Sequence, residues 1–508
     1  MRPLLFSILL ATLTVPLFAA PGPAPVPSLA LTYDAEEQPT EKNVVTQALQ
    51  GQLAAKGISI KIEPATIAIF NDRLARGDFE AMFNSWFIDY PESEAYLTDF
   101  YSKSAYRAAR YNSPAFDQIY MAAIKAHSES EKLAHFHDAV KLLDHELAWV
   151  PLYSNNEIFL LKPGAAGFRS NIYQYYDYSH VALEHVRAEC EVTPETFDPM
   201  FLYDLGAKSI ATPSYEPLVM LDENAKIVPG LATEWTWSKD MDSVTFKLRP
   251  GVHFHPAGNF SHTPNRTMTA ADVKFSFERL AKIGASYSYT FDHVRGIDEF
   301  RAGKAREVTG LQVVDDLTFR VVMKYPFPLM VTWLMAPAAC IIPADTPEKY
   351  DFTHGSIGTG PFVLKSWDGR QALYTPQAGY WQKDEKGVAL PYAKDLSIRI
   401  MLDANTTLLA YREGDLDILN VPIALFREVF DVDGSLKPEW KKDIYREVLL
   451  PNLKFIAFNM EKPPWGTNLE LRQRISDSID REAIVRGIFR GKARPARSVM
   501  PKGIPGFE

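Results

Sequence analysis

The sequence YEPLVMLDENAKIVPGLATEWTWSKDMDSVTFKLRPGVHFHPAG, at residues 215–258, is the most informative stretch of this chain. Its second half has the two-residue period of a half-buried strand, with apolar side chains at Val244, Phe246 and Leu248. After an insertion, residues 268–280 read MTAADVKFSFERL and have the pattern of a helix that begins after Thr269, a residue suited to an N-cap. This part of the chain is therefore predicted to be a β-rich unit that carries a helix.

Strands and helices continue to alternate downstream of this stretch. Residues 310–324 predict a hairpin that turns at Asp315-Asp316, where the two carboxylates are expected to be solvated. Further strands are predicted at 396–401 and 453–460, and further helices at 404–411 and 471–489. The pattern is typical of α/β lobes.

The region upstream predicts a second set of α/β elements. Residues 28–64 read as strand, helix and strand, the βαβ unit of an open sheet, and Gly57 is placed to end the helix. Two helices are predicted at 115–126 and 130–147, and an apolar strand pair at 150–162 that ends at Pro163-Gly164. The basic run FRGKARPAR, residues 489–497, is predicted to be a solvated loop.

Ordered motifs in both halves resemble one family. Residues 215–280 resemble the opening of the periplasmic solute-binding proteins of ABC importers, family 5, the oligopeptide, dipeptide and nickel type. Residues 28–186 resemble the closing part of that family, in SLALTYD, RGDFEAMFNSWFIDYPESEAYL, RYNSPAFDQIY and WVPLYSNNEIFLLKPGAAGF. Because the family's end comes first here, the chain resembles a circular permutant, and the resemblance covers nearly everything after residue 28.

The resemblance implies an α/β fold: a two-lobed, type II-like periplasmic binding protein with an extra small α/β domain, circularly permuted. The expected division is a signal peptide at 1–20, a Pro-rich spacer at 21–27, a ligand-binding lobe from 28–155 plus 452–508, a second lobe from 156–215 plus 342–451, and a small third domain at 216–341. In the family, a helix links the two segments that form the ends of this chain, and that helix is missing from both ends here. The first lobe is therefore expected either to be one helix short or to have its groove covered by another segment. A fusion of one receptor's tail to another's head is the alternative, and complementary halves would give the same fold.

Composition and the first 27 residues limit the possible functions. An apolar content of 46% is ordinary for a globular protein. A formal charge of −9 argues against a general nucleic-acid binder. Residues 1–20 hold one Arg, an apolar run and small residues, as a secretory signal peptide does, with an uncleaved anchor as the alternative. No cysteine follows this run, so a free periplasmic protein is expected, without a lipid anchor. Cys190 and Cys340 could form a disulfide or remain two separate thiols.

The same resemblance implies a peptide site around SWFIDYPES. It implies that Asp89 pairs with the ligand's α-ammonium group, since a buried ammonium needs a fixed carboxylate. Ser85, Trp86 and Phe87 would lie on a strand that hydrogen-bonds an extended peptide, with Trp86 as an apolar wall. The alternatives are a turn aspartate and a core tryptophan. Phe83 replaces an Arg that binds the peptide's C-terminus in some oligopeptide receptors, so Phe83 is expected to give apolar contact only and peptide length to be loosely specified.

Other candidate residues give weaker signals. Tyr153, at the presumed hinge, is predicted to line the cleft, and the alternative is that it completes a strand. His253 and His255 have an H-x-H spacing that zinc sites can use, but a structural role is favoured, and no metal or cofactor is expected. Motifs of serine hydrolases, zincins, phosphate loops and dinucleotide folds are not found in their required contexts, so no catalytic residue is expected.

Together these features predict an exported, non-enzymatic, periplasmic receptor of an ABC importer. It would bind peptides between two lobes and deliver them to inner-membrane permease subunits, as a monomer and without nucleic acid. The alternatives are a receptor for a nickel chelate, haem or an opine, a periplasmic hydrolase, and a degenerate sensor domain.

Overall fold

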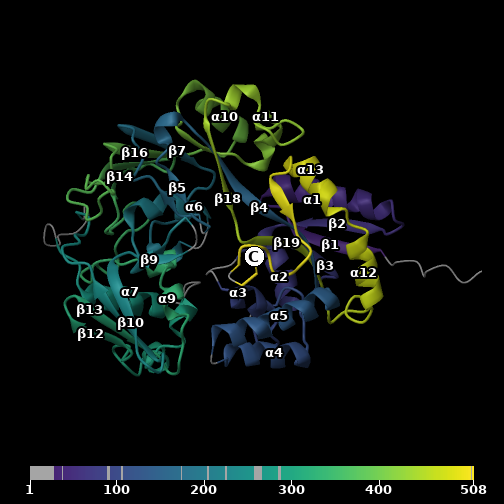
Figure 1. The fold of residues 1–508 in the computed structure, drawn as a ribbon, viewed down its shortest axis with the longest axis horizontal. Helices are drawn as coiled ribbons and strands as arrows, with labels where there is room; N and C mark the ends of the chain where they lie inside the picture. Colours follow the sequence, from purple (N-terminus) through teal and green to yellow (C-terminus); the bar gives the residue numbers. More distant parts are fainter. Residues whose placement is uncertain are drawn as a thin grey trace, which may run out of the picture.

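The computed structural model describes residues 28–507 except 37, 88–91, 105–106, 127, 173, 203–204, 224–225, 257–265, 284–287 and 505. The signal peptide and spacer predicted for residues 1–27 therefore lie outside the described residues, and so does Asp89. Figure 1 shows two halves on either side of a central pair of strands. Among the helices that the structure describes, none is both long enough and apolar enough to cross a membrane.

The largest sheet joins the early and late parts of the chain. Its eight strands are β1 (Leu29–Asp34), β2 (Ile60–Ala65), β3 (Ala81–Phe87), β4 (Trp149–Leu161), β17 (Ile418–Asn420), β18 (Ile444–Leu449), β19 (Asn452–Phe458) and β20 (Ala493–Pro495). Their order is β17-β4-β19-β3-β1-β2, with β18 and β20 also paired to β4. Because β19 lies between β3 and β4, antiparallel to both, residues from 28–155 and 452–508 share one sheet. The domain boundaries themselves stay a prediction.

β4 connects the two halves. It is one continuous strand of 13 residues, so the predicted strand pair at 150–162 is wrong. The polar Asn155 and Asn156 in its middle suggest a turn, but their side chains bind Glu41 and Glu447, and the strand continues through them. The first half of β4 pairs with β19 and β20 and the second half with β17 and β18, so β4 and the β18–β19 line run between the halves (Figure 1).

Helices cover both faces of this sheet. α1 (Pro39–Ala54), α12 (Leu469–Asp477) and α13 (Arg481–Phe489) share one buried apolar cluster with β1. α2 (Ile67–Arg76) packs separately with Met82. α3 (Glu94–Leu97), α4 (Pro114–Ile124) and α5 (Glu129–Glu146) belong to the cluster in which Trp149 and Phe455 stack, with ring centroids 3.7 Å apart. The helices predicted at 115–126 and 130–147 are confirmed; Ser113 and Ser128 cap them.

The other half contains two four-stranded sheets. One has the order β14-β15-β16-β7, from β7 (His185–Cys190), β14 (Phe362–Trp367), β15 (Gln371–Pro376) and β16 (Asp395–Ile400). The other has the order β10-β11-β13-β12, from β10 (Ala232–Trp237), β11 (Ser243–Leu248), β12 (Leu311–Asp315) and β13 (Thr318–Val322). The predicted hairpin at 310–324 is confirmed. So is the alternation in β11, where the three apolar side chains are buried.

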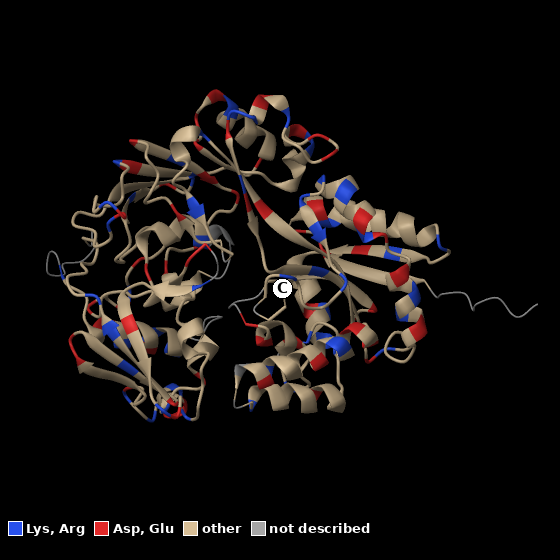
Figure 2. Cartoon of the chain, in the orientation of Figure 1, with Lys and Arg blue, Asp and Glu red and all other residues tan. Residues whose placement is uncertain are grey.

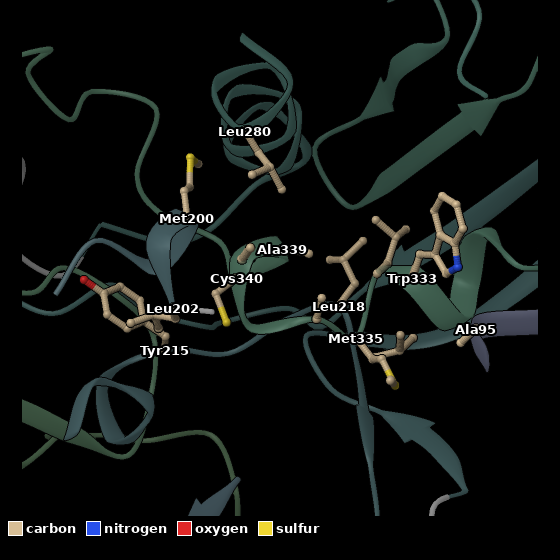
Figure 3. Packing of buried hydrophobic residues seen from close by; sticks show 14 of the residues in the cluster. Ala95, Met200, Leu202, Tyr215, Leu218, Leu280, Trp333, Met335, Ala339 and Cys340 are labelled. Atoms are coloured by element: carbon tan, nitrogen blue, oxygen red, sulfur yellow. The ribbon is translucent and has the colours of Figure 1, made fainter. Parts of the chain in front are cut away.

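Shorter elements complete this half and its connections. They are β5 (Arg169–Ser170), β6 (Tyr176–Asp177), β8 (Val219–Leu221), β9 (Ile227–Pro229), α6 (Leu205–Ala211), α7 (Ala270–Ile283), α8 (Ile297–Arg301), α9 (Met330–Trp333), α10 (Ala404–Glu413) and α11 (Phe426–Val429). Gly358 has a structural role here, because a Cβ at this position would lie 1.9 Å from the Ser214 carbonyl oxygen. Cys190 and Cys340 are both buried thiols, and Cys340 lies among apolar side chains that include Leu202 and Tyr215 (Figure 3).

The basic run at 489–497 does not form a solvated loop, so that prediction is wrong. Residues 493–495 form β20, which pairs with β4, and the Arg494 guanidinium donates to the Leu450 carbonyl oxygen at 3.1 Å. The local charge pattern does not reveal that part of this run pairs with the edge of β4. Figure 2 shows Lys and Arg interspersed with Asp and Glu over both halves of the described chain.

Candidate functional site at the carboxyl ends of β1 and β3

The candidate site begins where β3 extends past β1. These two strands are parallel, and their register ends at the pair Tyr33–Phe83. On its other side β3 is paired along its whole length with β19, as far as Phe87 with Asn452. Open α/β sheets bind ligands at the carboxyl ends of their parallel strands. Residues 84–87 are therefore the part of β3 that is placed to meet a ligand.

The predicted contact residues on β3 differ in exposure. Phe83 is 1% exposed and packs with Tyr33 in the apolar cluster under α1. Ser85 and Phe87 are half-buried, as is Trp86, whose Nε1 donates to the Ala95 carbonyl oxygen at 3.2 Å. The structure thus brings Ser85, Trp86 and Phe87 to the candidate edge, whereas the burial of Phe83 favours a packing role. All four assignments as ligand contacts stay predictions, as does that of Asp89.

Tyr153 is fully buried and belongs to a polar cluster below this edge. Its hydroxyl donates to Glu41 Oε1 at 2.9 Å, and Asn155 Nδ2 donates to both oxygens of the same carboxylate. Burial, followed by the charge of Glu41, raises the pKa of Tyr153 well above its ordinary value, so the hydroxyl keeps its proton. These contacts favour a structural role for Tyr153 and leave its predicted role in the cleft untested.

Two buried lysines lie in the same cluster, and neither was selected from the sequence. Lys42 Nζ pairs with Asp34 Oδ2 at 2.8 Å, at the end of β1. Lys454, on β19, donates to Gln38 Oε1 at 2.6 Å and lies 3.7 Å from Glu41 Oε1. A signal was present for Lys454, since it is the single charged residue in the apolar strand LKFIAF. Such a lysine inside a buried strand is rare without a partner.

A second buried polar cluster lies where β4 enters the other half. Glu157 of β4 accepts hydrogen bonds from the side chains of Tyr176, Gln174, Ser170 and Asn420. The backbone N–H of Asn420 donates to Glu189 Oε1 at 3.1 Å, so one residue links the two carboxyl groups. Burial raises the pKa of Glu157 to about 7 and that of Glu189 to about 8.

The structure also places the other residues considered from the sequence. His255 is buried, its Nε2 lies 2.8 Å from the Gly360 carbonyl oxygen, and burial lowers its pKa to about 4. His255 therefore packs as a neutral side chain. In the described part of the chain, no group of three or more His, Cys, Asp or Glu residues is arranged to hold a metal ion.

Comparison with known proteins identifies the class of this fold. Residues 226–508, more than half of the chain, match the family model described as Bacterial extracellular solute-binding proteins, family 5 Middle. The chain therefore belongs to family 5 of the bacterial extracellular solute-binding proteins. This confirms the predicted family and the α/β fold class of type II periplasmic binding proteins. The circular permutation stays a prediction.

Several curated relatives match part of the chain. Heme-binding protein A of Haemophilus influenzae is 31% identical over 289 residues, which cover 55% of this chain and 49% of the relative. Glutathione-binding protein GsiB of Salmonella typhi is 27% identical, covering 61% of this chain and 54% of the relative. The dipeptide-binding protein of Escherichia coli is 26% identical, covering 62% and 58%. The chain spans about half the length of these relatives.

Solved structures match a comparable share of this chain. The Escherichia coli murein tripeptide binding protein MppA is 22% identical, with a TM-score of 0.42 over 48% of this chain and 47% of that one. Haemophilus influenzae OppA in complex with the peptide RPPGFSPFR is also 22% identical, with a TM-score of 0.39 over 46% and 45%.

Proposed function

We propose that this protein is a periplasmic receptor that binds peptides and delivers them to an ABC importer. Family membership supports a solute-binding role. The observation that carries the peptide assignment is the β3 edge at residues 84–87, which extends beyond the register with β1 and lies next to the strands joining the two halves. An extended peptide can add to such an edge through main-chain hydrogen bonds. The proposed role is non-catalytic.

Two of the three curated relatives described above are named for peptide-like ligands, and the third is named for haem. Curated relatives include proteins named for glutathione and for dipeptides, and a structural neighbour is named for a murein tripeptide. Each of those molecules carries an amide backbone and free charged ends. In this proposal Asp89, which follows the candidate edge in sequence, pairs with the α-ammonium group of the peptide. Permease subunits in the inner membrane are the proposed partners.

Calorimetry with free and N-acetylated peptides tests this function. Free di- to hexapeptides are expected to bind, and N-acetylated versions are expected to bind poorly because they lack the ammonium group. Asp89→Asn should weaken binding of free peptides by about 2–5 kcal/mol, the range for breaking a buried charge pair. Asp78→Asn is the matched control, because Asp78 precedes the same strand and its side chain is 72% exposed. Failure of every free peptide to bind the native protein would contradict the proposed function.

A further inference from the structure

Lys454 is a buried cation with incomplete partners. It is 4% exposed, on a strand whose other side chains are also buried. An ammonium group has three N–H donors. Among the described residues, its one hydrogen bond goes to Gln38 Oε1, and the nearest carboxylate oxygen, of Glu41, lies at 3.7 Å, beyond hydrogen-bond distance. A buried charge with spare donors is costly unless a further acceptor reaches it.

The position of this ammonium group coincides with the candidate edge. Lys454 is the cross-strand partner of Ser85 on β3 and of Tyr153 on β4, so these three side chains lie in one row on one face of the sheet. Gln38 follows β1 by four residues and therefore brings the ammonium group to the carboxyl end of β1. A peptide strand added beside residues 85–87 would continue the line of β1. β19 lies on the opposite side of β3 from β1, so only the ammonium group of Lys454, which reaches Gln38, would approach the end of this peptide nearest Tyr33.

The surroundings of Lys454 favour an anionic partner at this end. Glu41 is already bound by Tyr153 and Asn155, so its carboxylate is shared among three groups. The first residue before α1, Gln38, makes no side-chain cap, and the positive end of the helix dipole points to the same place. Gln38 is exposed and has φ of 51°, a left-handed conformation that is unfavourable for residues other than glycine. The hydrogen bond that Lys454 donates to a described side chain therefore ends on an exposed residue.

We propose that Lys454 is a specificity-determining residue that binds a carboxylate of the ligand, with Gln38 as the side chain that this carboxylate displaces. The proposal rests on the proposed peptide-binding function and narrows its substrate class to peptides that carry a carboxylate near the end of β1. That carboxylate is either the C-terminus of the peptide or an acidic side chain, since both present the same chemistry. Phe83 supplies no cation here, and the Arg187 guanidinium is engaged in a bidentate pair with Asp417.

The test compares three peptides on the native protein and on two variants by calorimetry. The peptides are trialanine, trialanine amide, and Ala-Glu-Ala amide, which separate a terminal carboxylate from a side-chain carboxylate. Lys454→Met removes the charge at nearly constant length and leaves Glu41 with its Tyr153 and Asn155 donors. Lys162→Met is the matched control, because Lys162 also lies 3.7 Å from a buried carboxylate, that of Asp443, at the far end of β4.

The native protein is expected to bind trialanine at least about tenfold more tightly than trialanine amide, a difference of about 1.4 kcal/mol, if the C-terminus is the source. If the carboxylate that Lys454 binds comes from an acidic side chain, Ala-Glu-Ala amide should bind more tightly than trialanine amide by a similar factor. Lys454→Met should abolish the preference, and Lys162→Met should keep it.

Equal binding of all three peptides to the native protein, or an unchanged preference in Lys454→Met, overturns the inference while the proposed function stands. Binding of none of them overturns both. The comparison on the native protein decides the matter even if Lys454→Met fails to fold.

Discussion

At the scale of single residues, the buried glutamates Glu157 and Glu189 have the clearest energetic consequence. Both carboxyl groups are 8% exposed or less, and Asn420 connects them. Burial away from water disfavours the ionised form, which is why their pKa values rise to about 7 and about 8. Desolvation also raises the pKa of Glu191, which adds a further acidic group beside them.

These raised pKa values predict that the folded protein loses stability as the pH rises. A carboxyl group whose pKa is higher in the folded state binds its proton more tightly there than in the unfolded chain. Its contribution is complete below pH about 4.5, the ordinary value, and disappears as the pH rises through 7 and 8. The Tm measured by calorimetry should therefore fall by a few degrees between pH 6 and pH 8.5.

Glu189→Gln should reduce this fall, because the amide oxygen can still accept from Asn420 N–H while the titration is removed. Glu234→Gln, at an exposed position on β10, serves as the control and should leave the pH dependence unchanged. A slope that is identical in the native protein and in Glu189→Gln would show that other groups cause it.

At the scale of elements, β3 combines two environments in seven residues. Its first three side chains are buried under helices, and its last four are half-buried beyond the register with β1. Recognition by this second part would depend mainly on the peptide backbone, because main-chain hydrogen bonds do not distinguish side chains. β19 supplies the fixed neighbour that holds this edge in place along its full length.

This arrangement predicts loose selection of peptide length. Phe83 is buried and uncharged, so it cannot fix a carboxylate at one distance from Asp89. Di- to hexapeptides of matched composition are expected to bind within about tenfold of one another, or about 1.4 kcal/mol. Calorimetry or thermal shift with such a panel measures this range. One length that binds far above the rest would contradict the prediction and would show that a residue other than Phe83 fixes the C-terminus of the peptide.

At the scale of the whole molecule, the largest sheet joins the beginning and the end of the described chain in one core. β19 and β20 complete the sheet begun by β1, β3 and β4, and α12 and α13 cover the same apolar cluster as α1. Near the end of the described chain, Phe507 lies against His137 of α5, with ring centroids 4.3 Å apart. Each half alone would expose these apolar faces to water.

We therefore expect the reordered chain, residues 184–508 followed by a Gly/Ser linker and residues 28–183, to fold to the same structure. Its Tm should lie within a few degrees of that of the native order, and it should bind the same peptides, because the contacts between the halves are unchanged. Far-UV circular dichroism, calorimetry and peptide titration measure this. The natural order with a matched linker placed between residues 183 and 184 is the control. A reordered chain that remains unfolded would argue against the circular permutation.

Periodicity and motif order determined much of this protein from the sequence alone. The strand at Val244 to Leu248, the hairpin at 310–324 and the helices before Trp149 are local patterns, and local patterns are set by neighbouring residues. Only the tertiary structure decided that β4 is one strand, that the basic run is a sheet edge, and that Lys454 meets Gln38 and Glu41. The physical reason is distance along the chain: these features depend on partners hundreds of residues away, which no local period records.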